Sequence, residues 1–369
     1  MIYLIPNFLL LIIESDNDHF IKDILKKWKE GKGLYRYELS SGNGNFIKRL
    51  LNSLKNLILI KNLIDNANYQ FVFFEWGSTL LRRVTNLFKI EKPVVARIHR
   101  YEVFEKRIYK INFNEINKII LVSEYIKKVF LKKFPNLEGK IVLIPNAINL
   151  DKFYPDPDKK KNFKICTLSF LEERKRIDLV IEAMKFIKNP TIKLHIGGVG
   201  NIGTQLKNRI QYEKLEDRVF LDGKIDNLQE WYRDKDIIIN SSENESFGVS
   251  IIEAMACEVI PFIRGWGAAK YLYPKEFILP YHEQKFIKSL SGQMDNFYQL
   301  SDVIQDSERK LARNFVLKNY SLEKQVQNFN SLFHSLLKSK KHENINYRKS
   351  VGIKWIFKFF LSFIKEVKK

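Results

Sequence analysis

The sequence of 369 residues is poor in cysteine, in long apolar runs and in acidic charge. Its two cysteines, Cys166 and Cys257, argue against a disulfide framework and a cysteine-based metal site. The six histidines lack the spacing of a metal motif, so we expect no protein-bound metal. The apolar N-terminus holds about 13 uncharged residues, short of the roughly 20 that span a bilayer, so we expect it to form the first core strand.

The 63 lysines and arginines outnumber the 42 acidic residues, and the resulting formal net charge of +21 predicts an anionic partner. Nucleic acid, an anionic membrane surface and a phosphorylated substrate all fit such a charge. Because no RNA- or DNA-binding motif is visible, we expect no nucleic acid partner.

Short apolar strands alternate with amphipathic helices along the chain, which predicts parallel sheets in doubly wound domains. The alternation runs from Phe8 to about residue 145, stops in the proline-containing segment 149–163, and then resumes. A 45% apolar fraction is sufficient for two cores. We therefore predict an N-terminal domain at residues 1–155, a second domain at 156–338 and a basic tail at 339–369.

Two carboxylates stand out in the segment 240–263, which follows the strand 236–240. Glu245 lies in a polar loop. Glu253 lies in a predicted helix from Gly248 to Cys257, about 7 Å along the helix axis from its start. One interpretation is a capped surface helix with solvated acids. The other is a binding site in which the helix N-terminus and both acids hold a polyhydroxylated ligand.

A glycine motif supports an alternative function. Gly198, Gly200 and Gly203 form a literal G-x-G-x-x-G after the strand 191–196, which is typical of an NAD(P)-dependent oxidoreductase. However, the motif follows the second strand of its domain, whereas the dinucleotide fingerprint belongs to the first strand–helix turn.

Three segments carry a family likeness. ENESFGVSIIEAMA (243–256) resembles the E-x7-E signature of the retaining glycosyltransferases of family four, also called group 1 glycosyltransferases. PNAINLDKFYP (145–155) and EERKRIDLVIEAM (172–184) resemble that family's linker and its diphosphate-binding segment. The likeness covers roughly residues 92 to 338. It implies the GT-B architecture, in which two Rossmann-like domains face each other, here with an added C-terminal amphipathic helix.

The resemblance also implies roles for individual residues. Lys175, helped by Arg174, would neutralise the donor diphosphate, and Glu253 would bind the ribose. Glu245 would hold the hydroxyls of the transferred sugar, together with the backbone at Ser246, Phe247, Gly248 and Val249. The nucleobase would lie near Ile225, and His99 would approach the donor sugar from the N-terminal domain.

The sequence departs from the family at three places. Ser169 and Phe170 stand where the family has glycine and arginine, and Glu258 stands where glycine is common. The segment after the first strand, ESDNDHF, lacks the usual glycine-rich loop. These departures keep open a third hypothesis, a non-catalytic membrane- or glycan-binding scaffold.

The tail adds a membrane hypothesis. As a helix, residues 351–369 would separate lysines from aromatic and aliphatic residues, and the apolar part would span only about 21 Å. This pattern is typical of a helix lying on an anionic membrane. We expect a cytoplasmic enzyme, peripheral on the inner membrane face, with no cofactor. Its donor would be a UDP-, GDP- or ADP-sugar, UDP being favoured, and its acceptor a lipid-linked or glycan molecule.

Overall fold

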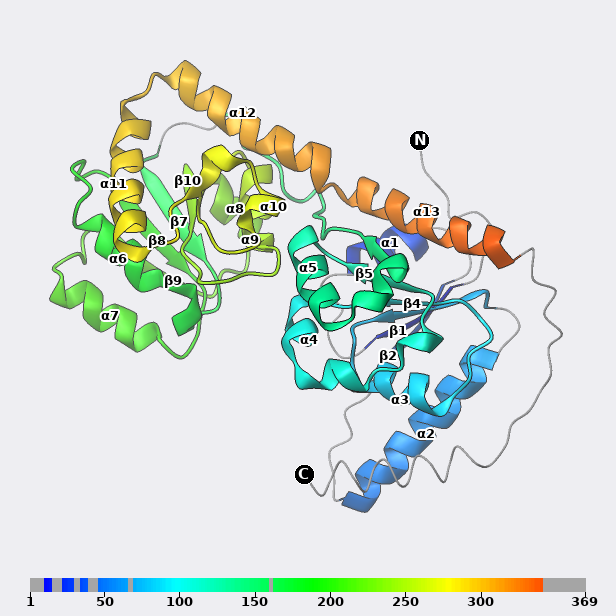
Figure 1. Ribbon diagram of the computed structural model, residues 1–369. Coiled ribbons are helices and arrows are strands. Elements are labelled where there is room, and N and C mark those ends of the chain that lie inside the picture. Colours follow the sequence, from blue (N-terminus) through cyan, green and yellow to red (C-terminus); the bar gives the residue numbers. More distant parts are fainter. Residues whose placement is uncertain are drawn as a thin grey trace. The chain divides into compact units, whose positions relative to one another are not determined.

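The computed structural model describes residues 10–14, 22–29, 34–38, 46–65, 69–158 and 162–340, and the predicted tail helix lies outside these ranges. The chain divides into two compact units (Figure 1). The first contains the chain up to residue 122, residues 126–144 and the chain from Val326 onward. The second contains residues 123–125 and 145–325.

The first unit is built on a parallel sheet with the strand order β2-β1-β3-β4-β5-β6. The strands are β1 (Leu10–Glu14), β2 (Leu34–Glu38), β3 (Phe71–Glu75), β4 (Val94–Arg97), β5 (Lys118–Leu121) and β6 (Ile141–Leu143). The helices that accompany them are α1 (Lys22–Lys29), α2 (Phe46–Asp65), α3 (Thr79–Leu87), α4 (Arg100–Phe104), α5 (Glu124–Lys133) and α13 (Leu322–Lys340).

The last described helix, α13, packs its aromatic residues on the first unit. Phe333 lies 5.4 Å from Phe71 between ring centroids, and Phe329 meets Phe73 edge to face at 5.7 Å. The second domain was predicted to end at residue 338, whereas the chain from Val326 onward belongs to the first unit. The reason is that α13 buries its apolar face on β3, which is distant in sequence.

The second unit repeats the architecture with the strand order β12-β11-β10-β7-β8-β9, and its strand pairs are parallel. The strands are β7 (Lys164–Leu168), β8 (Lys193–Gly197), β9 (Val219–Gly223), β10 (Ile237–Asn240), β11 (Ile260–Arg264) and β12 (Ile278–Leu279). The helices are α6 (Ile177–Met184), α7 (Gly203–Tyr212), α8 (Leu228–Arg233), α9 (Val249–Ala256), α10 (Ala269–Leu272), α11 (Glu283–Gln299) and α12 (Asp302–Asn319).

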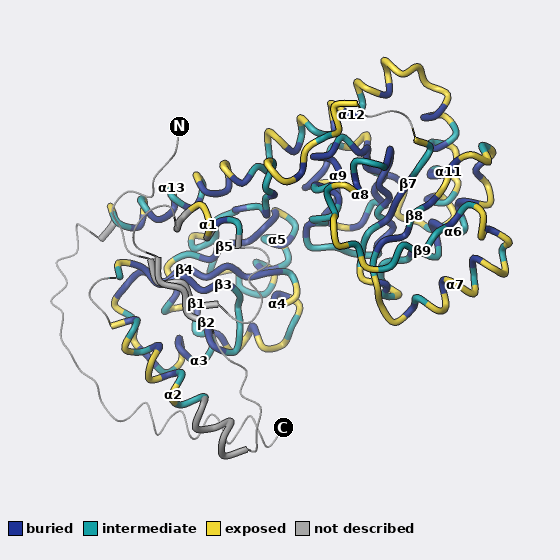
Figure 2. Tube along the Cα trace, turned by 180° about the vertical axis from the view of Figure 1, so that it is seen from behind, coloured by how far each residue is buried: buried dark blue, intermediate teal, exposed yellow. Residues whose placement is uncertain are grey.

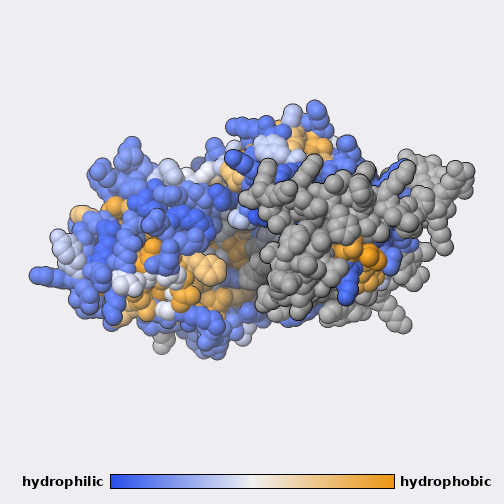
Figure 3. Space-filling view, turned by 90° about the horizontal axis from the view of Figure 1, so that it is seen from below, coloured by the Kyte–Doolittle hydropathy of each residue, from blue (hydrophilic) through white to orange (hydrophobic). Residues whose placement is uncertain are grey.

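Strands carry the core of each unit, and helices present exposed residues outward (Figure 2). Strand–helix alternation forces parallel pairing because each helix returns the chain to the same sheet edge. The predicted α/β class with two doubly wound units is confirmed. On the face drawn in Figure 3, the second unit is mostly hydrophilic, with small hydrophobic patches. Within the described ranges, no helix combines the length and apolarity needed to cross a bilayer.

Candidate active site

The candidate site lies at the carboxyl edge of the second sheet, where β7 and β10 are neighbours. From β7 the sheet continues through β8 and β9, and from β10 it continues the other way through β11 and β12. Open parallel sheets bind ligands where their strand order reverses in this manner. The loops that follow β7 and β10 carry the predicted Lys175 and Glu245.

Lys175 and Glu245 form an ion pair across these two loops, although they are 70 residues apart in sequence. Lys175 Nζ lies 2.5 Å from Glu245 Oε1, and the two side chains are only 12% and 13% exposed. Ser242 Oγ donates to the same carboxylate oxygen at 2.8 Å. Arg174 Nη1 lies 4.0 Å from Glu245 Oε2, while its Nε and Nη2 bind Glu172. The structure therefore brings three predicted residues together.

The backbone places Lys175 in a turn before the helix rather than in its first turn. Residues 173–175 form a 3-10 turn, and Arg176 then adopts a left-handed conformation with φ of 49°, so that α6 begins only at Ile177. Ser241 Oγ donates to the Lys175 carbonyl at 2.8 Å, and the Glu243 N–H donates to the Arg174 carbonyl at 2.9 Å. These bonds join the two loops and hold Lys175 beside Glu245.

The N-terminus of α9 begins at a position that favours glycine. Gly248 caps the helix with φ of +79°, and a Cβ there would lie 2.7 Å from Ile251 Cδ1 and 2.9 Å from Tyr273 Oη. The Tyr273 hydroxyl donates to the carbonyl of buried Phe247 at 2.6 Å. The first-turn N–H groups, beginning at Val249, carry the positive end of the helix dipole, and that of Ile251 donates to the Gly248 carbonyl at 3.0 Å.

Glu253 lies on α9 and meets Tyr232 of α8. The Tyr232 hydroxyl donates to Glu253 Oε2 at 3.4 Å. Burial raises the pKa of Glu253 to about 7, while the charge of Lys152 and the Tyr232 hydrogen bond act to lower it. This glutamate is therefore not the solvated surface acid of the simpler interpretation.

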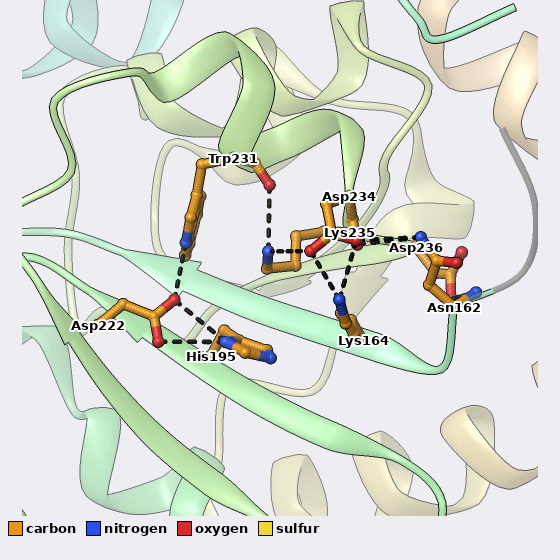
Figure 4. Close-up of polar contacts among 8 residues, drawn as sticks. All are labelled: Asn162, Lys164, His195, Asp222, Trp231, Asp234, Lys235 and Asp236. Atoms are coloured by element: carbon orange, nitrogen blue, oxygen red, sulfur yellow. Dashed lines mark hydrogen bonds and ion pairs between the residues drawn. The ribbon is translucent and has the colours of Figure 1, made fainter. Parts of the chain in front are cut away.

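A polar network fixes α8 to the sheet (Figure 4). Trp231 Nε1 donates to Asp222 at 2.7 Å, and Asp222 also binds His195 Nδ1 at 3.1 Å. Just beyond the helix, Lys235 Nζ donates to the Trp231 carbonyl at 3.2 Å, and Asp234 accepts from Lys164 of β7 at 2.9 Å. These contacts from β7 and β9 determine where the helix, and with it Tyr232, lies.

The glycine motif after β8 has a packing reason. A Cβ on Gly198 would lie 1.8 Å from the Ser169 carbonyl oxygen, and one on Gly200 would lie 2.2 Å from the Leu171 carbonyl oxygen. The loop after β8 therefore packs backbone to backbone against the loop after β7. Packing accounts for these two glycines without a dinucleotide.

Ile225, the predicted nucleobase contact, lies beside Gly197 at the end of β8. A Cβ placed on Gly197 would lie 3.1 Å from Ile225 Cγ1. Phe170, in the position of the family's arginine, is 72% exposed, and the buried Ser169 hydroxyl has no hydrogen-bond partner within the described chain. The loop after β7 thus presents Arg174 and Lys175 as cations, and none at the family's usual position.

Glu258 occupies a position that suits glycine. It follows the last turn of α9 with φ of 59°, and its N–H donates to the Met255 carbonyl at 3.0 Å. Helices often end with a left-handed residue, for which glycine is the least strained choice. The left-handed backbone conformation at this position explains why glycine suits it. Glu258 adopts the same conformation with a side chain in place of glycine.

His99 lies in the first unit, within a buried charge cluster at the ends of β3 and β4. Glu75 Oε1 accepts from Arg97 Nε at 2.8 Å and lies 2.7 Å from Arg97 Nη2 and 2.9 Å from His99 Nε2. Burial lowers the pKa of His99, which favours a neutral imidazole. Trp76, with a strained φ of 93°, packs against His99 at 4.1 Å between ring centroids, with the two rings tilted by 33°.

Glu102 joins the two loops of this cluster. Its carboxylate accepts the His99 N–H at 2.8 Å and the Gly77 N–H, and burial raises its pKa to about 8. Sequence analysis placed Glu75 at a strand end without assigning it a role, and it did not single out Arg97 or Tyr232. Glu75 had a signal, since an acid that ends a fully apolar strand needs a buried partner. Tyr232 had no such signal in the sequence, because its partner Glu253 lies 21 residues away.

A cavity of about 480 Å³ opens elsewhere on the second unit. Its lining includes Asn162 and Asp234, which precede β7 and β10, so it lies at the amino edge of the sheet. Ligands of parallel sheets bind at the opposite edge, so this cavity is separate from the candidate site. In the part of the chain that is described, no group of three His, Cys, Asp or Glu residues is arranged to hold a metal ion.

Solved structures define the class of fold. The chain is similar to a glycosyltransferase from Rickettsia africae, with a TM-score of 0.69, 20% identity and coverage of 90% of this chain and 99% of that one. It is also similar to Anabaena HepE in complex with UDP, with a TM-score of 0.69, 15% identity and coverage of 89% and 100%. These similarities confirm the GT-B fold.

Sequence comparison then gives a matching family. Residues 151–271 match the family "Glycosyl transferases group 1", which confirms the resemblance carried by the E-x7-E segment. A Staphylococcus aureus poly(ribitol-phosphate) α-N-acetylglucosaminyltransferase is 25% identical over 68% of this chain and 52% of its own. A Schizosaccharomyces pombe phosphatidylinositol N-acetylglucosaminyltransferase subunit is 26% identical over 55% and 44%. The chain thus spans about half the length of these curated relatives.

Proposed function

We propose that the protein is a retaining glycosyltransferase that moves a sugar from a nucleotide diphosphate sugar to an acceptor hydroxyl. The observation that carries this proposal is the Lys175–Glu245 pair beside the N-terminus of α9, at the point where the second sheet reverses its order. The family match over residues 151–271 supports it, since both loops fall within that range.

In the proposed reaction, the bond between the anomeric carbon and the β-phosphate oxygen breaks, and the acceptor oxygen bonds to that carbon from the same face. The acceptor proton passes to the departing phosphate oxygen. Lys175, Arg174 and the α9 N–H groups stabilise the negative charge that accumulates on the diphosphate, so no metal ion is assigned this role. Positioning and charge stabilisation are the contributions of the protein.

Glu245, with the backbone from Ser246 to Val249, is assigned to the hydroxyls of the transferred sugar, and Glu253 to the ribose. Ile225 is assigned to the nucleobase. His99 is assigned to the donor sugar, for which the geometry supports a neutral, fixed imidazole held by Glu75 rather than a proton carrier.

UDP-N-acetylglucosamine is the donor we propose to test first, because N-acetylglucosaminyl transfer is named for the Staphylococcus aureus and Schizosaccharomyces pombe relatives, and the Anabaena structure holds UDP.

A thermal-shift panel of UDP, GDP, ADP and their sugars is expected to show stabilisation by one base series, UDP first. Ligand at about 100 times its dissociation constant stabilises the folded state by about 2.7 kcal/mol. Glu245→Ala is expected to abolish transfer of the matching sugar while the nucleoside diphosphate still binds. A panel without any shift, or wild-type transfer by Glu245→Ala, would count against the proposal. Stabilisation by NAD(H) alone would favour the oxidoreductase alternative.

We also propose that the acceptor is lipid-linked or a glycan and that the enzyme works on the inner face of an anionic membrane. Within the first unit, α5 contributes Lys127, Lys128, Lys132 and Lys133. Tyr101 and Phe104, from α4, are among its exposed aromatic residues. Such mixed basic and aromatic surfaces bind anionic bilayers.

Deletion of residues 351–369 is expected to reduce co-sedimentation with anionic liposomes. Each basic residue at such a surface contributes about 1 kcal/mol, so removal of the basic tail has a large expected effect. A full-length variant with Lys354, Lys358, Lys365 and Lys369 changed to glutamine separates charge from chain length. Neutral liposomes serve as the control. Equal sedimentation of the full-length and truncated proteins would contradict this role for the tail.

A further inference from the structure

Tyr232 is a buried side chain that the proposed reaction does not yet use. Its exposed fraction is 0%, and its hydroxyl donates a hydrogen bond to Glu253 Oε2. A buried hydroxyl without a hydrogen bond is costly, so this contact is a requirement of the fold as well as a property of the site.

The ring of Tyr232 is held from several sides. Phe153 packs against it at 6.4 Å and Trp231 at 5.5 Å between ring centroids. The Tyr232 carbonyl accepts from the Lys235 N–H at 2.9 Å. With α8 itself anchored through Trp231 and Asp234 (Figure 4), the hydroxyl has a defined position relative to α9.

Other ionisable groups also lie around Glu253. Lys152, from the turn that precedes β7, contributes a favourable charge. Cys166 of β7 and Cys257 at the end of α9 are buried close to Tyr232. From α12, Arg313 donates to the Ala256 carbonyl. Among these groups, the Lys152 charge and the Tyr232 hydrogen bond oppose the effect of burial on Glu253.

We infer that Tyr232 is a positioning residue that orients the Glu253 carboxylate so that it accepts hydrogen bonds from the ribose of the donor nucleotide. This inference rests on the proposed function, because it concerns the same nucleotide site. It extends that function by naming a residue on α8 that does not itself contact the substrate.

The sign of the pH effect follows from the chemistry of the carboxyl group. The ionised form accepts hydrogen bonds from ribose hydroxyls, whereas the protonated form is a weaker acceptor. Because the pKa of Glu253 is about 7, nucleotide affinity is expected to fall as the pH falls through neutrality. Loss of the Tyr232 hydroxyl raises this pKa further, which moves the fall in affinity to higher pH.

The experiment measures UDP binding by calorimetry from about pH 6 to about pH 9. The proteins are the wild type, Tyr232→Phe, Glu253→Gln and the double variant. We expect Tyr232→Phe to weaken binding about fivefold at neutral pH and to approach wild-type affinity at the alkaline end. Glu253→Gln should bind weakly with little dependence on pH, and adding Tyr232→Phe to it should have little further effect. Tyr212→Phe, at an 85% exposed position of α7, is the matched control.

Three outcomes would overturn the inference. One is a wild-type pH profile in Tyr232→Phe, including the case in which only its melting temperature falls. Another is that Tyr232→Phe weakens UDP binding by the same factor in the wild type and in Glu253→Gln. In both cases the wild type still binds UDP, so the proposed function stands. If the wild type binds none of UDP, GDP or ADP, the proposed function fails as well.

Discussion

Lys175→Ala is expected to lower the turnover of sugar transfer by about 100- to 1,000-fold, the usual effect of removing one charge-stabilising donor from a preorganised site. Lys175 is held by both loops, with its carbonyl bound by Ser241 and its ammonium by Glu245. Removing it leaves the Glu245 carboxylate without its closest cation and the departing diphosphate without a fixed charge. Initial rates with the donor found in the panel measure the effect.

Controls separate this chemistry from a general loss of charge. Lys185→Ala removes a lysine of the same unit, partly exposed and paired with Glu182 and Glu213, and should leave turnover within about twofold of wild type. Lys175→Arg keeps a cation and should retain more activity than Lys175→Ala. Wild-type turnover in Lys175→Ala would show that the donor phosphates lie elsewhere.

Glu75→Ala is expected to lower the free energy of unfolding of the first unit by about 3–5 kcal/mol, because it leaves a buried arginine without its counter-charge. The side chains of Glu75 and Arg97 are both 0% exposed. Burial alone would raise the pKa of Glu75, but Arg97 and His99 together hold it below its ordinary value. Denaturant unfolding, followed by hydrogen exchange of β3 and β4 to assign the change to this unit, measures the loss.

The matched control is Glu138→Ala, which removes the partner of Lys127 from a 70% exposed position in the same unit. An exposed pair of this kind contributes about 0–1 kcal/mol, so little change is expected. If Glu75→Ala were as stable as Glu138→Ala, the cluster around His99 would not hold the ends of β3 and β4 together. The proposed fixed orientation of His99 would then lose its support.

Local patterns predicted most of the secondary structure. Apolar runs such as the one ending at Asn240 became strands, and the helix carrying Glu253 begins within one residue of the predicted Gly248. A left-handed Arg176 separates Lys175 from α6, within a segment whose composition favours a continuous helix. Such a break depends on the bonds from Ser241 and Glu243, which no local window contains.

Strand periodicity and the spacing of Glu245 and Glu253 are local properties, so the amino-acid sequence was sufficient to predict the fold class and to mark both acids as candidate site residues. Tertiary structure alone decided the partners: Glu245 for Lys175, Tyr232 for Glu253, Glu75 for Arg97 and His99, and β3 for the helix after Val326. The physical reason is that a buried charge or hydroxyl must find a partner wherever the folded chain supplies one, and folding, rather than sequence distance, sets which groups meet.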